Sequence, residues 1–179
     1  QTFVPLKSLL QVKYFDFITL QNFSFINQKL SFVPTQSFLE FQNLKSLKLH
    51  NISLVGNQIN VDSSSTLVTI KEVANLTISS LQLSSNTFET LKTDPLRLHL
   101  NLFDIIDTKS AKLSGHSLHS NTFDGLIRML KFRGSETTLA LEINDIMFTL
   151  NNNNKQSSNL FTYLSLQSQA LQELNLENI

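Results

Sequence analysis

The sequence predicts an all-β solenoid, a parallel β-helix of about five to six coils of roughly 30 residues with three short strands in each coil. Three observations predict it: a motif that recurs at this period, short runs in which apolar and polar residues alternate, and the lack of a sustained helical period. One such repeat is too small to bury its own apolar face, whereas stacked copies bury a continuous core.

The recurring motif is clearest in 20–28 (LQNFSFINQ) and 49–58 (LHNISLVGNQ), which align when one residue is inserted before the closing Asn-Gln of the second copy. Further copies are 78–86, 113–121, 143–151 and the partial copy 176–179. One position of the motif holds Asn22, Asn51, Ser80, Gly115, Asp145 and Asn178, and the closing position holds Asn27, Asn57, Asn86, Asn121 and Asn151. Asn, Asp and Gly tolerate the left-handed backbone conformation that a sharp bend requires, so we predict bend residues at the first position.

Two alternating runs precede most copies of the motif, and their period of two with many Leu, Ile, Val, Phe and Thr residues is typical of strands. They are 37–41, 66–70, 96–100, 125–132 and 160–166, followed by 44–49, 73–78, 139–143 and 171–176. We expect the apolar residues of the motif, such as Leu49, Ile52 and Leu54, to stack inside the coil. Phenylalanines at 17, 23, 25, 38, 41, 148 and 161 lie in or beside the strands and are expected to contribute to that core.

The repeat between Asn86 and Asn121 is the longest, at 35 residues. Its additional residues are expected to form a loop either near Glu89 to Pro95 or near Asp107 to Lys112. Because the pattern continues to both ends of the sequence, we expect residues 1–179 to be a single β-helix domain within a longer chain.

The composition limits the possible partners. The 179 residues have a net charge of zero and only 16% charged residues, compared with about 25% in a typical soluble domain. A nucleic-acid surface needs a concentrated basic patch, which this sequence lacks. There is no cysteine, no apolar run approaches the roughly 18 residues of a membrane span, and His116 and His119 lie outside any helical pattern. We therefore predict no nucleic-acid partner, no membrane span, no metal and no cofactor.

The stretch NLTISSLQLSSN (75–86) resembles the rungs of the pectin-lyase-like right-handed parallel β-helix superfamily, and this resemblance implies a right-handed coil. The closing Leu-x-x-Asn also resembles the Phe-x-x-Asn repeats of polymorphic surface proteins, although their companion Gly-Gly-Ala-Ile motif is absent. The alternative fold is a leucine-rich repeat, whose leucine spacing LKSLKLHNISL matches. That family places Asn where this chain has Ile52, Leu81, Ile146 and Ile179, so the β-helix is favoured.

Many β-helices cleave polysaccharides, and glycoside hydrolysis needs two carboxylates about 5–10 Å apart. The candidate carboxylates are Asp104, Asp107 and Asp124. The Asn-Thr-Asp, Asp-Asp and Arg-x-Lys elements of polygalacturonases are absent, so we predict that the protein is not an enzyme. A polysaccharide-binding or polysaccharide-cleaving β-helix is the alternative, and a leucine-rich-repeat interaction module is a third.

Three sequences match the acceptor pattern for N-linked glycosylation, at Asn22, Asn51 and Asn75. If the amides of Asn22 and Asn51 stack inward at the bend, a glycan is excluded there. Asn75 shares a strand face with Thr77, opposite Leu76 and Ile78, and is expected to be the most accessible acceptor. We therefore predict a structural or adhesive glycoprotein of the cell exterior or cell surface, part of a surface layer or filament. Its expected partners are N-linked glycans and further copies or neighbouring solenoid segments.

Overall fold

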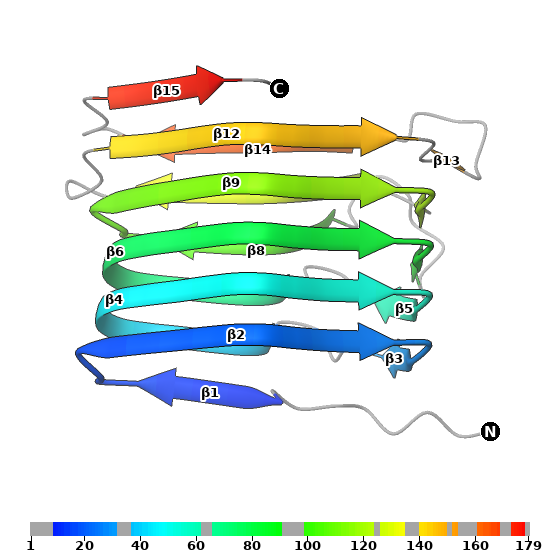
Figure 1. Ribbon diagram of the computed structural model, residues 1–179, viewed down its shortest axis with the longest axis horizontal. Coiled ribbons are helices and arrows are strands. Elements are labelled where there is room, and N and C mark those ends of the chain that lie inside the picture. Colours follow the sequence, from blue (N-terminus) through cyan, green and yellow to red (C-terminus); the bar gives the residue numbers. More distant parts are fainter. Residues whose placement is uncertain are drawn as a thin grey trace.

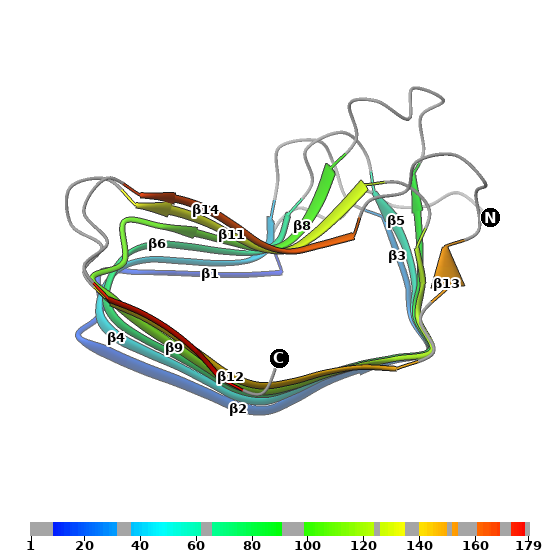
Figure 2. The ribbon, with the colours of Figure 1, turned by 90° about the horizontal axis from the view of Figure 1, so that it is seen from above.

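The computed structural model describes residues 9–31, 37–61, 66–90, 99–123, 126–134, 140–149, 152–153, 161–168 and 173–177. They form an all-β solenoid of about four turns in which parallel strands stack from coil to coil (Figure 1). Viewed from above, the chain turns anticlockwise as it rises toward the viewer, so the coil is right-handed (Figure 2). The predicted fold class is confirmed. The predicted number of coils is too high, because the motif counts passages along part of the coil, whereas a turn requires a passage along every side.

Each coil has four sides, which we call A, B, C and D in chain order (Figure 2). A ten-stranded sheet bends twice to make sides A, B and C, and a five-stranded sheet makes side D. Side D follows the closing Asn of the motif, so the prediction of three strands per coil missed one strand.

The strands divide among these sides as follows. Side A contains β1 (Leu10–Lys13), the first parts of β4 (Ser37–Val55) and β6 (Thr66–Ser84), β8 (His99–Ile106), β11 (Leu126–Gly134) and β14 (Phe161–Ser168). Sides B and C contain β2 (Phe17–Ile26), the rest of β4 and β6, β9 (Ser110–His119) and β12 (Ala140–Thr149), and side B also contains β15 (Glu173–Glu177). Side D contains β3 (Lys29–Ser31), β5 (Gln58–Val61), β7 (Thr87–Thr90), β10 (Thr122–Phe123) and β13 (Asn152–Asn153).

The parallel register places the same motif position of every coil in one column. On side B, for example, Leu20 pairs with Leu49, Leu49 with Ile78, and Ile78 with Leu113. Two parallel sheets on four sides of the coil are incompatible with a single-sheet horseshoe, so the leucine-rich-repeat alternative is wrong at the level of the fold.

The register also locates the additional residues of the longest repeat. On side D, Val61 pairs with Thr90 at the ordinary spacing. On side A, Thr66 pairs with Asn101, which lies 35 residues further along the chain. Asn75 and Ser110 on side B pair at the same separation. The additional residues therefore lie between Thr90 and Asn101, mostly outside the described residues, and the alternative position from Asp107 to Lys112 is wrong.

The apolar core fills the inside of the coil. Leu49, Ile52 and Leu54 are at most 5% exposed, as predicted, and each such side chain contributes roughly 1.5–3 kcal/mol by leaving water. Phe38 and Phe41 are buried, and Phe23 and Phe25 pack against the core. The side chains of Phe148 and Phe161 lie outside what the structure describes.

Phe17 differs from the prediction, because it is 75% exposed. It occupies the side B column of Ser46 and Asn75. These residues alternate with the core positions Leu47 and Leu76 and face away from the core.

The A–B, B–C and C–D corners of the coil, which the structure describes, need a left-handed backbone. Every described non-glycine residue with positive φ lies at one of them, as do Gly56 and Gly115. The A–B corner holds Tyr14, Asn43, Glu72 and Asp107; the B–C corner holds Asn22, Asn51, Ser80, Gly115 and Asp145; the C–D corner holds Asn27, Gly56, Ser85 and Ser120. At the B–C corner φ lies between 54° and 65°. Asn178, the last residue of that set, lies outside the described residues.

Candidate functional site

A ladder of buried asparagines runs along the C–D corner. Asn57, Asn86 and Asn121 are at most 1% exposed. The Nδ2 of Asn57 donates to the Oδ1 of Asn86, and the Nδ2 of Asn86 donates to the Oδ1 of Asn121, both at 3.0 Å. Asn151, the next closing residue in the sequence, lies outside the described residues.

Each of these amides also binds the backbone of the coil before it. The Oδ1 of Asn86 accepts from the backbone nitrogen of Asn57 at 3.0 Å, and its Nδ2 donates to the carbonyl oxygen of Leu54 at 2.8 Å. Asn57 donates in the same way to the oxygen of Phe25, and Asn121 to that of Leu83. Buried polar groups destabilise a fold unless they are hydrogen-bonded, and here both ends of each amide are bonded. The closing asparagines therefore join consecutive coils.

Asn27 is not part of this ladder. The register of side D pairs Lys29 with Gln58, and the backbone nitrogen of Gln28 donates to Asn57 Oδ1 at 2.8 Å. Gln28 therefore corresponds to Asn57, and Asn27 corresponds to Gly56. The two copies of the motif therefore align in the structure without an insertion, and the predicted match of Asn27 with Asn57 is wrong. Asn27 is an exposed corner residue with a φ of 53°.

His116 is a buried titratable group within the core. It is 1% exposed and pairs with Ile146 in the column that also contains Ile52 and Leu81. Its Nε2 lies 3.4 Å from the carbonyl oxygen of Ile78, and its Nδ1 has no hydrogen-bond partner. Burial lowers the pKa of His116 from 6.5 to about 4, partly opposed by the contact with Ile78. The imidazole is therefore neutral at physiological pH.

The three glycan-acceptor candidates all have exposed side chains. Asn22 and Asn51 stack at the B–C corner, where the Nδ2 of Asn51 donates to the Oδ1 of Asn22 at 2.7 Å. Asn75 lies on the outer face of side B, and its Nδ2 makes only a long contact of 3.4 Å with the carbonyl oxygen of Lys45. The amide of Asn75 is therefore held less firmly than that of Asn51.

A trough of about 400 Å³ adjoins Asn75 on the outer face of side B. The column of Asn75 continues with the small residues Ser110 and Ala140 and reaches Glu173 on the last strand. The adjacent column, which forms the second edge of the trough, holds Thr77, Lys112, Glu142 and Asn175.

Glu142 is held in place at this edge. Lys112 Nζ donates to Glu142 Oε1 at 2.8 Å, and Asn144 Nδ2 donates to the same oxygen at 2.6 Å. The hydrogen bond from Lys112, followed by that from Asn144, holds the pKa of Glu142 below its usual value. The trough therefore presents an ionised carboxylate beside an ammonium group.

A second hollow, of about 580 Å³, lies at the A–B corner. Ala74 stands between Lys45 and Lys109 in neighbouring coils, and its short side chain leaves space there. Leu44 and Val73 line the hollow on its apolar part, with the carboxylates of Asp16, Glu72 and Asp107. Tyr14 and Phe15, which are 77% and 55% exposed, line it at the first coil.

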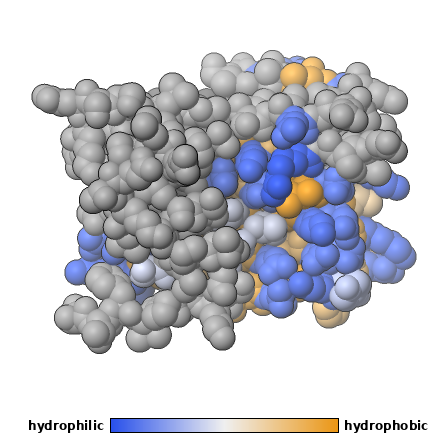
Figure 3. Space-filling model, turned by 180° about the vertical axis from the view of Figure 1, so that it is seen from behind, coloured by the Kyte–Doolittle hydropathy of each residue, from blue (hydrophilic) through white to orange (hydrophobic). Residues whose placement is uncertain are grey.

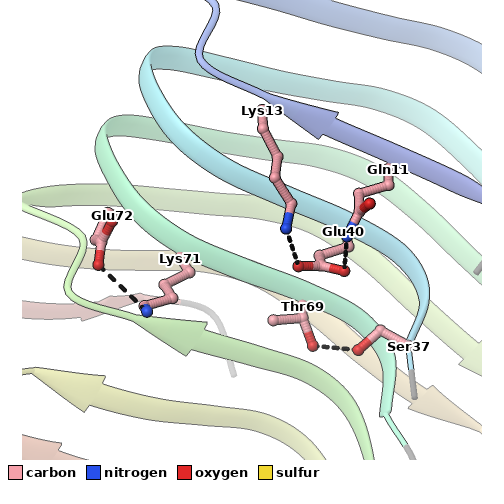
Figure 4. A network of polar contacts seen from close by, with 7 residues as sticks. All are labelled: Gln11, Lys13, Ser37, Glu40, Thr69, Lys71 and Glu72. Carbon is pink, nitrogen blue, oxygen red and sulfur yellow. Dashed lines mark hydrogen bonds and ion pairs between the residues drawn. The ribbon is translucent and has the colours of Figure 1, made fainter.

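The outer face of side A is mainly hydrophilic where the structure describes it (Figure 3). Figure 4 shows how its polar side chains connect neighbouring coils. Glu40 accepts from Gln11 at 2.6 Å and pairs with Lys13 at 3.1 Å, both from β1. Ser37 and Thr69 share a hydrogen bond between β4 and β6.

Two members of the predicted carboxylate set, Asp104 and Asp107, have different surroundings. Asp104 is bound by Arg133 of the next coil, with Nε–Oδ1 and Nη2–Oδ2 distances of 3.0 and 2.5 Å. Asp107 instead lines the hollow at the A–B corner, beyond the end of β8. Asp124 lies outside the described residues. Sequence reasoning missed Glu72, because its corner position has no residue-type signature.

Within the described ranges, no group of three or more His, Asp or Glu side chains is placed to hold a metal ion. The same part of the chain forms no helix with the length and apolar composition that a membrane crossing requires. Comparison with protein-family models, curated proteins and solved structures finds no match for this chain.

Proposed function

We propose that this chain is a non-catalytic structural or adhesive segment of an extracellular or cell-surface β-solenoid glycoprotein. The observation that carries the proposal is the use of its polar side chains. The buried amides of Asn57, Asn86 and Asn121 connect coil to coil. Carboxylates on the outer faces do the same, as Asp104 does with Arg133 and Glu142 with Lys112. Side chains bonded in this way hold neighbouring coils together, and their polar atoms are less available for proton transfer.

The distribution of exposed apolar residues supports association with further copies or neighbouring solenoid segments. The described residues include seven exposed large apolar side chains, and five of these lie in the first coil. The five are Leu9, Tyr14, Phe15, Phe17 and Ile26. The first strands β1, β2 and β3 each pair with strands of the second coil. A parallel strand edge can accept another strand in the same register. A surface layer or filament built by such stacking is the assembly that we propose.

The pattern of the rungs supports placing the chain in the pectin-lyase-like superfamily, and this placement is also a proposal. The parallel coil of the structure is consistent with it. Because a fold does not determine an activity, the superfamily is not an argument for catalysis.

Location tests the proposal directly. Antibodies against the purified chain should label intact native cells as strongly as permeabilised cells. The purified chain should also release no reducing ends from the polysaccharides of that cell surface. Labelling that requires permeabilisation would overturn the extracellular assignment, and release of reducing ends would overturn the non-catalytic one.

A second candidate function, polysaccharide binding or cleavage, is favoured by the hollow at the A–B corner. The hollow combines exposed aromatic rings, Tyr14 and Phe15, with the carboxylates of Glu72 and Asp107. Ligand sites typically combine an apolar wall with a few polar groups. Binding of surface polysaccharide that Glu72→Gln and Tyr14→Ala weaken, and that Lys48→Gln on the outer face of side B leaves unchanged, would favour this function. Equal binding by all three variants would reject it.

A further inference from the structure

We propose that Asn75 carries an N-linked glycan and that the first sugars of this glycan lie in the trough beside it. The inference rests on the proposed function, because N-linked glycosylation requires passage through the secretory route. It goes further by choosing one acceptor among three and by assigning an occupant to the trough.

The geometry of the acceptor favours Asn75. Its side chain is exposed, and its Nδ2 donates to the carbonyl oxygen of Lys45 at 3.4 Å, which lies at the upper limit for a hydrogen bond. Thr77, the hydroxyl residue of the acceptor pattern, lies on the same outer face. Attachment of a sugar at Nδ2 therefore sacrifices little that stabilises the fold.

Asn22 and Asn51 are placed differently. The Nδ2 of Asn51 already donates to Asn22 at 2.7 Å. Both occupy the same corner on neighbouring coils, which in a parallel sheet are about 4.8 Å apart. Two glycans at this spacing would collide, because a glycan is much wider than one strand. Full occupancy of both sites is therefore disfavoured in the folded protein.

The length of the trough suits the beginning of a glycan. It follows the Asn75 column across the small side chains of Ser110 and Ala140 and ends at Glu173. Ala140 lies two coil spacings above Asn75, which is about 10 Å, and Glu173 closes the trough one spacing further. Two linked pyranose rings occupy such a length, and larger side chains than Ser and Ala in this column would obstruct them.

The polar side chains at the edge of the trough also suit sugars. Hydroxyl and acetamido groups both donate and accept hydrogen bonds. Thr77 and Lys112 can donate to them, and the ionised carboxylate of Glu142 can accept. The contacts of Glu142 with Lys112 and Asn144 hold its carboxylate at the trough in advance, so little side-chain freedom is lost when a sugar binds.

Site-resolved mass spectrometry tests the choice of acceptor. The whole chain is produced with a secretion signal in a eukaryotic host, and the glycan at each asparagine is quantified. Asn75 should be occupied, and Thr77→Val, which removes only the acceptor hydroxyl, should abolish that glycan. The matched variant Ser53→Ala should leave it in place. A bare Asn75 beside a glycan on Asn22 or Asn51 would overturn the inference and leave the proposed function standing.

Glycan release from the folded protein tests the occupancy of the trough. Ala140→Gln and, separately, Ser110→Gln obstruct the trough without changing the acceptor. A peptide-N-glycosidase should remove the Asn75 glycan about tenfold faster from either variant, which corresponds to about 1.4 kcal/mol of lost protection. Ser114→Gln, on the same face outside the trough, should release at the wild-type rate.

Equal release rates in wild type and both trough variants would overturn this part of the inference. If all three asparagines are bare, the whole inference fails. The cell-surface labelling described above then decides separately whether the proposed function fails with it.

Discussion

Asn86 and Asn121 form one step of a buried amide ladder. The Nδ2 of Asn86 donates to the Oδ1 of Asn121 at 3.0 Å, and the same Oδ1 accepts from the backbone nitrogen of Asn86 at 3.0 Å. One side chain therefore satisfies both a backbone donor and a side-chain donor of the coil before it. The closing asparagine of the motif is consequently a connector between coils, in addition to marking the corner.

Substitution of Asn86 by Ala should destabilise the solenoid by about 2–4 kcal/mol, because the backbone nitrogen of Asn57 and the carbonyl of Leu54 lose buried partners. Urea unfolding of the two proteins measures this difference. Gln82→Ala, an exposed position on β6 shortly before this corner, should change the free energy of unfolding by at most about 0.5 kcal/mol. Equal effects of the two substitutions would show that the ladder does not stabilise the fold.

His116 predicts a pH dependence of stability. The unfolded chain binds a proton on this residue near pH 6.5, whereas the folded chain does so only near pH 4. The stability contributed by the neutral form is complete above pH 6.5 and is lost as the pH falls toward 4, by about 3 kcal/mol.

Unfolding of wild type and His116→Leu, measured between pH 7 and pH 4, tests this dependence. The Leu variant should lose less stability over the window, and the exposed control His119→Gln should follow the wild type. Parallel curves for wild type and His116→Leu would contradict the assignment of the pH dependence to this histidine.

The ion pairs of Asp104 and Asp16 should differ in strength. Arg133 binds Asp104, whose side chain is 10% exposed, through two hydrogen bonds, whereas Lys45 and Asp16 are 69% and 61% exposed. Arg133→Ala should cost about 2 kcal/mol, since it leaves a shielded carboxylate without its partner. Lys45→Ala should cost less than about 1 kcal/mol.

A double-mutant cycle for each pair provides the measurement. The coupling between Arg133 and Asp104 should exceed that between Lys45 and Asp16. The reverse order would mean that shielding from solvent does not set the strength of these contacts.

Gly115 tests the bend column. A Cβ built on it meets no atom closer than 3.6 Å, so its φ of +65° is the main obstacle to substitution. Gly115→Ala should destabilise by about 1 kcal/mol through the left-handed conformation. Gly115→Asn should cost less, because Asn tolerates this conformation and occupies the same column at Asn51. Chemical unfolding of both variants gives the comparison, and an Asn variant no more stable than the Ala variant would contradict it.

The fold class was predictable because stacking requires the same chemistry in every coil. The alternation of Leu47, Leu49, Ile52 and Leu54 with polar residues identifies strands with one buried face, and repetition of the alternation identifies the solenoid. The B–C corner was also recognisable, because Asn, Asp and Gly are enriched where φ is positive.

Other features have no comparable signal. Tyr14 and Glu72 adopt positive φ at the A–B corner although neither residue type favours it. Side D was missed because its strands are short. Asn27 was misaligned because the sequence does not distinguish an exposed corner asparagine from a buried ladder asparagine. The exposure of Phe17 follows from its column on side B, since an aromatic residue carries no mark of the face on which it lies.

The sequence alone determined that the chain forms stacked β-coils, since a periodic pattern of apolar residues can be buried only by repeating one conformation. Only the tertiary structure decided which asparagines lie inside and which outside. It also decided that Asp104 is bound by Arg133 while Asp107 lines a separate hollow, and that Asn75 adjoins a trough. These outcomes depend on which residues of different coils share a column, and a column is defined by the register of hydrogen bonds between coils.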